Sequence, residues 1–185
     1  MTFRIHPILL LWFCLLLITG QAGLFSVVFV SLLIHELGHI SALKLLRVQN
    51  VNCILLPFGG RIEWTGHIEW TKAKQLFVYS GGPLATLVLI ASILALPLPI
   101  PHQILQIQWW ILVVNLLPVP PLDGGNIVQL FLADTRFQPF ATGLSHVALF
   151  GASLFAANQF FNEANVFPIV VAAVLLYENY LRIKS

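Results

Sequence analysis

Charged side chains are scarce in this sequence: Asp, Glu, Lys and Arg make up 9% of the 185 residues, while 58% are hydrophobic. An ordinary soluble domain carries roughly 25% charged residues. The composition therefore excludes such a domain and favours a protein whose main solvent is lipid. We predict an all-α polytopic membrane protein in which a single domain fills residues 1–185.

Cysteine and basic residues are also few. The 2 cysteines, Cys14 and Cys53, lack the number and the repeated spacing of a disulfide framework or a cysteine metal site. The 9 Lys and Arg residues give a net charge of only +2, and they are too scattered to line a groove that follows nucleic-acid phosphates. Nucleic acid is therefore not an expected partner.

Long hydrophobic runs, by contrast, are abundant. Charges, prolines or glycines bound each run, and most runs are long enough to cross the hydrocarbon core of a bilayer as a helix. We predict about six transmembrane helices, at residues 7–19, 24–46, 76–97, 103–132, 139–158 and 165–181.

Six spans would put every basic residue on one side of the membrane. The positive-inside rule then predicts a multi-pass protein of the cell membrane with both termini in the cytoplasm. One span more or fewer would scatter the basic residues over both faces. These residues are Arg4, Lys44, Arg47, Arg61, Lys72, Lys74, Arg136, Arg182 and Lys184.

Two histidines and a glutamate interrupt the second predicted span, in "HELGH" at residues 35–39. Ionisable groups at membrane depth cost several kcal/mol unless they are paired, bound to metal or facing water, so they indicate function. A lone intramembrane His can equally bond to a neighbouring helix. His35 and His39, however, are four residues apart and project from one helix face, where both can hold one cation. We predict a zinc site with Glu36 beside it.

Zinc held by two histidines needs a third protein ligand and leaves a fourth position for water in a hydrolytic site. Asp123 is the candidate, because the other acidic residues fall in predicted connections or near span ends. It lies in "NLLPVPPLDGG", residues 115–125, where prolines and glycines must unwind the span midway. The alternative is a kinked helix with Asp123 as its N-cap.

The two motifs together resemble the paired signatures of the site-2 protease family, the intramembrane zinc metalloproteases. "HPILLLWF", "LLPFGGRIEW", "GGPLA" and "LYENYLR" extend the resemblance along nearly the whole chain, towards members from spore-forming bacilli that release a membrane-tethered pro-sigma factor. The resemblance implies that His35, His39 and Asp123 bind one zinc per chain and that Glu36 is the general base. It also implies a substrate-orienting or oxyanion-facing role for Asn115.

Two departures from the family pattern limit what the resemblance implies. Related sporulation proteases carry a nucleotide-sensing cystathionine-β-synthase domain after the last span, and none is expected in a sequence that stops at Ser185. Counted from Gly81, "GGPLAT", residues 81–86, has Ala85 at the position four residues after glycine where some members have a polar residue. We interpret this segment as a site of close helix packing.

Residues 51–64, "VNCILLPFGGRIEW", form two short β-prone arms around Phe58, Gly59 and Gly60. This pattern predicts a small β-hairpin lying against the membrane. A free edge of the hairpin can pair with an unwound substrate strand, as the resemblance also implies, so residues 58–60 are candidate substrate-binding residues. A plain interfacial loop is the alternative.

The predicted function is that of an intramembrane zinc endopeptidase that cuts a transmembrane or membrane-tethered protein segment, such as a pro-sigma factor or another regulator. A regulatory membrane protein is a further candidate partner. The competing class is a zinc-binding membrane scaffold or a metal transporter. A transporter would offer ligand pairs along a pathway, whereas these ligands converge on one place and Glu36 has no evident transport task.

The segregation of basic residues generates a topology prediction. Reporter fusions after residues 100 and 161 should report outside the cell, and fusions at 70, 136 and 185 should report inside. Alkaline phosphatase and green fluorescent protein fusions provide the two readouts. A cytoplasmic signal at residue 100 would contradict the six-span topology.

Overall fold

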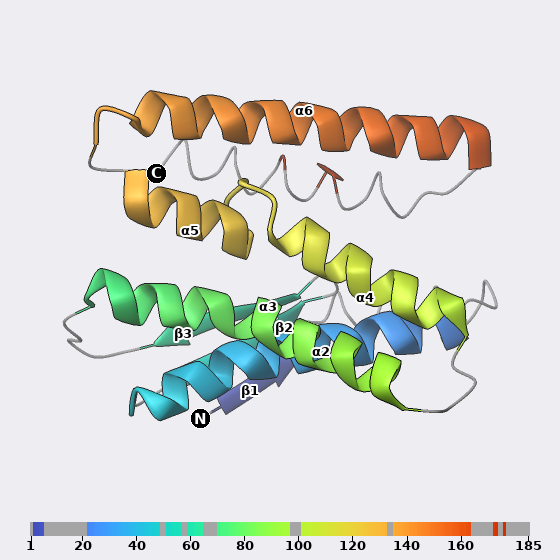
Figure 1. The fold of residues 1–185 in the computed structure, drawn as a ribbon, viewed down its shortest axis with the longest axis horizontal. Helices are drawn as coiled ribbons and strands as arrows, with labels where there is room; N and C mark the ends of the chain where they lie inside the picture. The colour runs from blue at the N-terminus through green and yellow to red at the C-terminus, as the bar shows by residue number, and fades with distance from the viewer. Residues whose placement is uncertain are drawn as a thin grey trace. The chain divides into compact units, whose positions relative to one another are not determined.

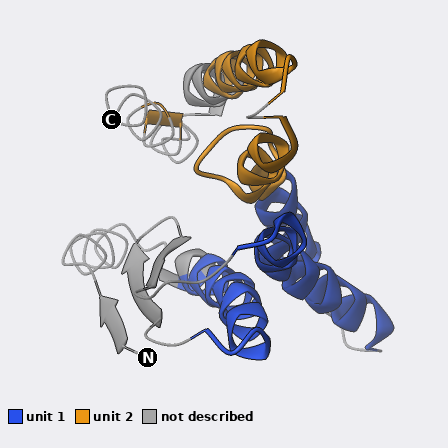
Figure 2. Ribbon diagram, turned by 90° about the vertical axis from the view of Figure 1, so that its left-hand side faces the viewer, with its two compact units in different colours: residues 1–113 blue, residues 114–185 orange. Residues whose placement is uncertain are grey.

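The computed structural model describes residues 2–5, 22–48, 51–56, 59–64, 70–96, 101–132, 135–163, 172–173 and 176. The chain divides into two compact units, residues 1–113 and 114–185 (Figure 2). The described part is predominantly helical, as predicted (Figure 1). Its elements are β1 (Thr2–Ile5), α2 (Ala22–Leu45), β2 (Val51–Leu56), β3 (Gly59–Trp64), α3 (Lys72–Ala95), α4 (His102–Asn115), α5 (Asp123–Leu132) and α6 (Gln138–Glu163).

Two of the described helices are long and apolar enough to cross a membrane. They cover Ser26–Leu45 in α2 and Lys72–Ala95 in α3, which correspond to the predicted spans 24–46 and 76–97. A helix of 20 residues is about 30 Å long, which matches the hydrocarbon thickness of a bilayer. The predicted spans 7–19 and 165–181 lie outside the described residues, apart from 172–173 and 176.

α2 and α3 pack against each other through glycine (Figure 1). A Cβ added at Gly38 would collide with the carbonyl group of Gly81, and one added at Gly81 would lie 2.7 Å from the carbonyl oxygen of Gly38. Ala42 and Val78 belong to the buried apolar cluster of this pair. Small residues allow such backbone contact between apolar helices. The packing role predicted for residues 81–86 is therefore confirmed at Gly81.

The predicted span 103–132 is broken, as its prolines and glycines indicate. α4 ends at Asn115 and α5 begins at Asp123, with a turn between them. The side-chain amide of Asn126 donates to the carbonyl oxygen of Pro121 at 3.0 Å, which fixes the turn to α5. A Cβ at Gly124 would collide with the carbonyl group of Leu116. Glycine at this position therefore allows the first turn of α5 to pack against the segment that connects it to α4.

The β-strands form a three-stranded sheet in the order β1-β2-β3. β2 and β3 pair antiparallel, from Val51 opposite Trp64 to Leu56 opposite Gly59. β1 pairs parallel to β2, from Thr2 opposite Asn52 to Ile5 opposite Leu55. The sheet thus has one strand more than the predicted hairpin, because pairing between segments so distant in sequence leaves no local signal. β3 forms one edge of the sheet.

A buried polar pair connects α2 with α4. The side-chain amide of Gln108 donates to the hydroxyl oxygen of Ser31 at 2.6 Å, and that hydroxyl donates to the carbonyl oxygen of Val27 at 2.7 Å. Gln108 is 1% exposed, and its Oε1 has no hydrogen-bond partner in the described structure. A buried acceptor without a partner costs about 1–3 kcal/mol.

The unsatisfied Gln108 oxygen generates a stability prediction. Gln108→Leu removes this oxygen while Ser31 keeps its bond to Val27, so we expect a melting temperature equal to or above that of the wild type. The measurement is thermal unfolding of the detergent-purified protein. Gln103→Leu, at an exposed position of α4, is the matched control. A clearly lower melting temperature for Gln108→Leu alone would show that the bond to Ser31 outweighs the burial cost.

Candidate metal centre

The "HELGH" residues lie in the middle of α2, where all three ionisable side chains are buried. His35 is 1% exposed, His39 7% and Glu36 9%. The two imidazole rings are one helical turn apart on one face, with ring centroids 5.1 Å apart and planes inclined by 76°. The helix thus presents two imidazole rings on one face, as the spacing predicts.

Hydrogen bonds to α3 bear on the tautomer of each neutral ring. His39 Nδ1 lies 2.7 Å from the carbonyl oxygen of Val78, which can only accept, so Nδ1 carries the proton. The amide nitrogen of Gly82 also lies 3.3 Å from this Nδ1, but a protonated Nδ1 cannot accept, and the shorter contact decides the tautomer. His39 therefore has the lone pair on Nε2 that binds metals.

Thr86 plays the same part for His35. Its Oγ1 lies 2.9 Å from His35 Nδ1, and its hydroxyl donates to the carbonyl oxygen of Gly82 at 3.2 Å. When the single hydroxyl proton is directed at Gly82, the Thr86 oxygen can accept the proton of Nδ1. His35 then also has its lone pair on Nε2. Sequence reasoning missed this role of Thr86.

Gly82 lies directly against Nε2 of both histidines. A Cβ added there would collide with Nε2 of His39 and with Nε2 of His35. Packing alone is thus an incomplete interpretation of "GGPLAT": Gly81 provides the helix contact, and Gly82 leaves room beside the two rings. The signal in the sequence was the second glycine, since a single one suffices for close approach.

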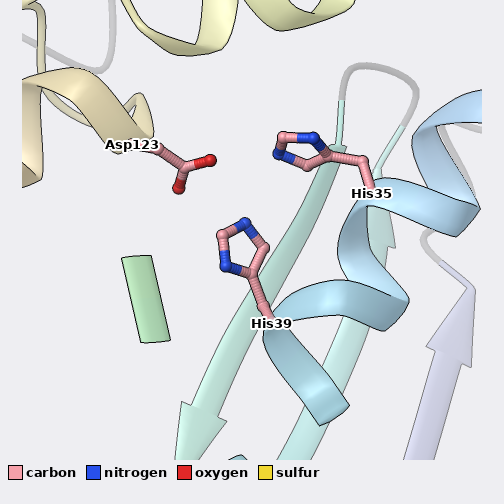
Figure 3. A group of neighbouring side chains, drawn as sticks. All are labelled: His35, His39 and Asp123. Carbon is pink, nitrogen blue, oxygen red and sulfur yellow. The ribbon is translucent and has the colours of Figure 1, made fainter. Parts of the chain in front are cut away.

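Asp123 is the first residue of α5 and is 8% exposed. His35, His39 and Asp123 each offer one ligand atom, these atoms all lie within 4.8 Å of one another, and the three side chains point toward one another (Figure 3). Two imidazole nitrogens and a carboxylate oxygen form a donor set that zinc accepts. This group could hold a metal ion.

The remaining predicted site residues lie on other elements. Asn115 ends α4 and is half-buried. Gly59 and Gly60 begin β3, while Phe58 lies outside the described residues. A substrate-binding role for these residues stays a prediction.

Comparisons with known proteins agree with the motifs, although no family model matches the chain. Over 143 residues it is 33% identical to stage IV sporulation protein FB of Bacillus subtilis, covering 74% of this chain and 49% of that protein. Over 121 residues it is 29% identical to a zinc metalloprotease of Methanocaldococcus jannaschii, covering 60% of this chain and 35% of that protein.

The fold has a counterpart among solved structures. A site-2 protease from Methanocaldococcus jannaschii aligns with a TM-score of 0.65 and 22% sequence identity, over 95% of this chain and 88% of that one. The chain belongs to the site-2 protease family. It spans 49% and 35% of the length of the two curated relatives above.

The position of Gly82 generates a prediction about metal binding. Gly82→Ala should weaken zinc binding about 10-fold or more, because the new methyl group displaces Nε2 of both histidines. Competition with a chromogenic chelator measures the affinity. Gly143→Ala, on α6, adds a methyl group with nothing within 4 Å and should bind zinc like the wild type. Equal affinities for all three proteins would refute the role of Gly82.

Proposed function

We propose that the chain is an intramembrane zinc endopeptidase in which His35, His39 and Asp123 bind one zinc ion and Glu36 is the general base. The observation that carries this proposal is the group of three ligand atoms within 4.8 Å, two of them on a helix apolar enough to cross a membrane. The names of the relatives, which include zinc metalloproteases, support the choice of metal and reaction.

The residues fit zinc in number and in protonation. Three protein ligands leave a fourth position for water, as in hydrolytic zinc sites, and the bonds to Val78 and Thr86 give both histidines the tautomer that binds metal. A bound zinc would polarise the peptide carbonyl under attack and make a water molecule more acidic.

The proton transfers belong to Glu36. It neighbours His35 in sequence and is buried in α2, as the two histidines are. Glu36 accepts the proton of the attacking water and returns it to the leaving amine. Asn115 orients the substrate or faces the developing oxyanion.

The enzyme is proposed to reside in the cell membrane with six spans and cytoplasmic termini. The two candidate spans among the described helices and the one-sided basic residues support this topology. α2 ends at Leu45, 6 residues or about 9 Å beyond His39. Lys44 lies in the last turn of α2, so the site is nearer the cytoplasmic face, from which water enters.

The proposed substrate is a transmembrane or membrane-tethered protein segment. Peptide hydrolysis requires an extended chain, and an unwound segment exposes backbone groups that need hydrogen-bond partners in lipid. β3 lies at the edge of its sheet, so Gly59 and Gly60, together with Phe58, are proposed to receive the substrate as an added strand. A membrane-tethered pro-sigma factor is one candidate substrate, and a membrane protein that regulates cleavage is a candidate partner.

Removal of the base should separate chemistry from metal binding. Glu36→Gln keeps the side-chain shape and the three ligands, so the protein should insert and bind one zinc per chain while cleavage falls about 10²–10⁴-fold. His35→Ala should lose both zinc and cleavage, because two ligands hold zinc poorly. Zinc is measured by elemental analysis, and cleavage by co-expression with a membrane-tethered substrate.

Ser41→Ala provides the control for this pair, because Ser41 is an exposed residue of α2 whose hydroxyl bonds to the carbonyl of Leu37 in its own helix. It should cleave like the wild type. Undiminished cleavage by a properly inserted Glu36→Gln variant would rule out the mechanism. Zinc-loaded protein that cleaves no membrane-tethered segment would instead favour a scaffold or a transporter.

A further inference from the structure

Thr86 is almost fully buried, at 1% exposed. Its hydroxyl does not need this burial to find a hydrogen-bond partner, because a hydroxyl in a helix can donate to the carbonyl one turn earlier even at an exposed position. Ser92 shows this on the same helix, since its hydroxyl donates to the carbonyl of Val88 at 2.8 Å while the residue is exposed. What distinguishes Thr86 is the second contact of its oxygen, 2.9 Å from His35 Nδ1.

Thr86 belongs to a stripe of α3 that follows the two histidines turn by turn. Val78, Gly82 and Thr86 are each four residues apart and therefore share one helix face. Val78 bonds to His39, Gly82 lies against Nε2 of both rings, and Thr86 bonds to His35. α3 thus contacts both rings of the candidate metal centre.

The two histidines are held by different kinds of acceptor. His39 bonds to a backbone carbonyl, which remains whatever side chain residue 78 carries. His35 bonds to a side-chain hydroxyl, which a point substitution removes. A neutral imidazole without a fixed partner at Nδ1 can place its proton on Nε2 instead, and that tautomer cannot bind metal through Nε2.

We propose that Thr86 is a positioning residue that holds His35 in its metal-binding tautomer and orientation, and that it sets the metal affinity of the site. The inference rests on the proposed function only in taking His35 as a metal ligand; it does not require proteolysis. Outer partners of this kind typically change metal affinity or activity by 10–100-fold.

The experiment compares Thr86→Val with Thr86→Ser in the full-length, detergent-purified protein. Valine keeps the shape of threonine without the hydroxyl, so zinc affinity should fall 10–100-fold, and the visible absorption spectrum of the Co²⁺-substituted protein should change. Serine keeps the hydroxyl, so affinity and spectrum should return close to those of the wild type. Ser92→Ala is the matched control, because it removes a hydroxyl from α3 that bonds only within its helix.

Thermal unfolding of the metal-free proteins separates this role from simple packing. If Thr86→Val unfolds before it can be measured, Thr86→Ala removes the same acceptor with less steric demand and is measured in its place. Wild-type zinc affinity and an unchanged Co²⁺ spectrum in the hydroxyl-free variant would overturn the proposal. So would a serine variant as weak as the valine variant, because the hydroxyl would then not be the group that matters.

The outcome is distinguishable from a failure of the proposed function. A wild-type protein that binds zinc but cleaves no membrane-tethered segment refutes the protease, while the affinities of the Thr86 variants still decide the role of Thr86. A wild-type protein that binds neither Zn²⁺ nor Co²⁺ refutes both.

Discussion

The backbone contact between α2 and α3 is the constraint on which the candidate site depends. Gly38 and Gly81 leave no room for a Cβ, so the backbones of the two helices lie in direct contact. This close packing brings the carbonyl of Val78 within hydrogen-bond distance of His39, and the hydroxyl of Thr86 within hydrogen-bond distance of His35. A larger side chain at either glycine would therefore push the two helices apart and weaken the site.

The position of the candidate third ligand, Asp123, depends on the break between two helices. Within residues 114–185, prolines end one helix and glycines allow the next to start against the connecting turn, which places a carboxylate in the first turn of α5. Val119 and Leu149 form the buried cluster that packs this turn onto α6. This packing covers the irregular backbone of the turn with protein.

Local sequence patterns predicted the helices and the candidate ligands. They could not predict contacts between segments that are distant in sequence. The spacing of His35 and His39 requires a helix, and the prolines before Asp123 require a break, so both features are visible in a few consecutive residues. The bond of Thr86 to His35 joins residues 51 positions apart, and β1 pairs with a strand about as distant. The sequence marks Thr86 as a polar residue four positions after Gly82, but it does not show which side chain the hydroxyl contacts.

The acceptor for His39 has a consequence for how the family can diverge. A main-chain carbonyl is present in every residue, so position 78 can change its side chain over evolutionary time and still orient the imidazole. Position 86 has no such freedom, since only a side chain with an acceptor of the right reach can replace threonine. A comparison of homologous sequences would thus show position 86 as restricted in its side chain. It would show no such restriction at position 78, although that residue also orients a histidine.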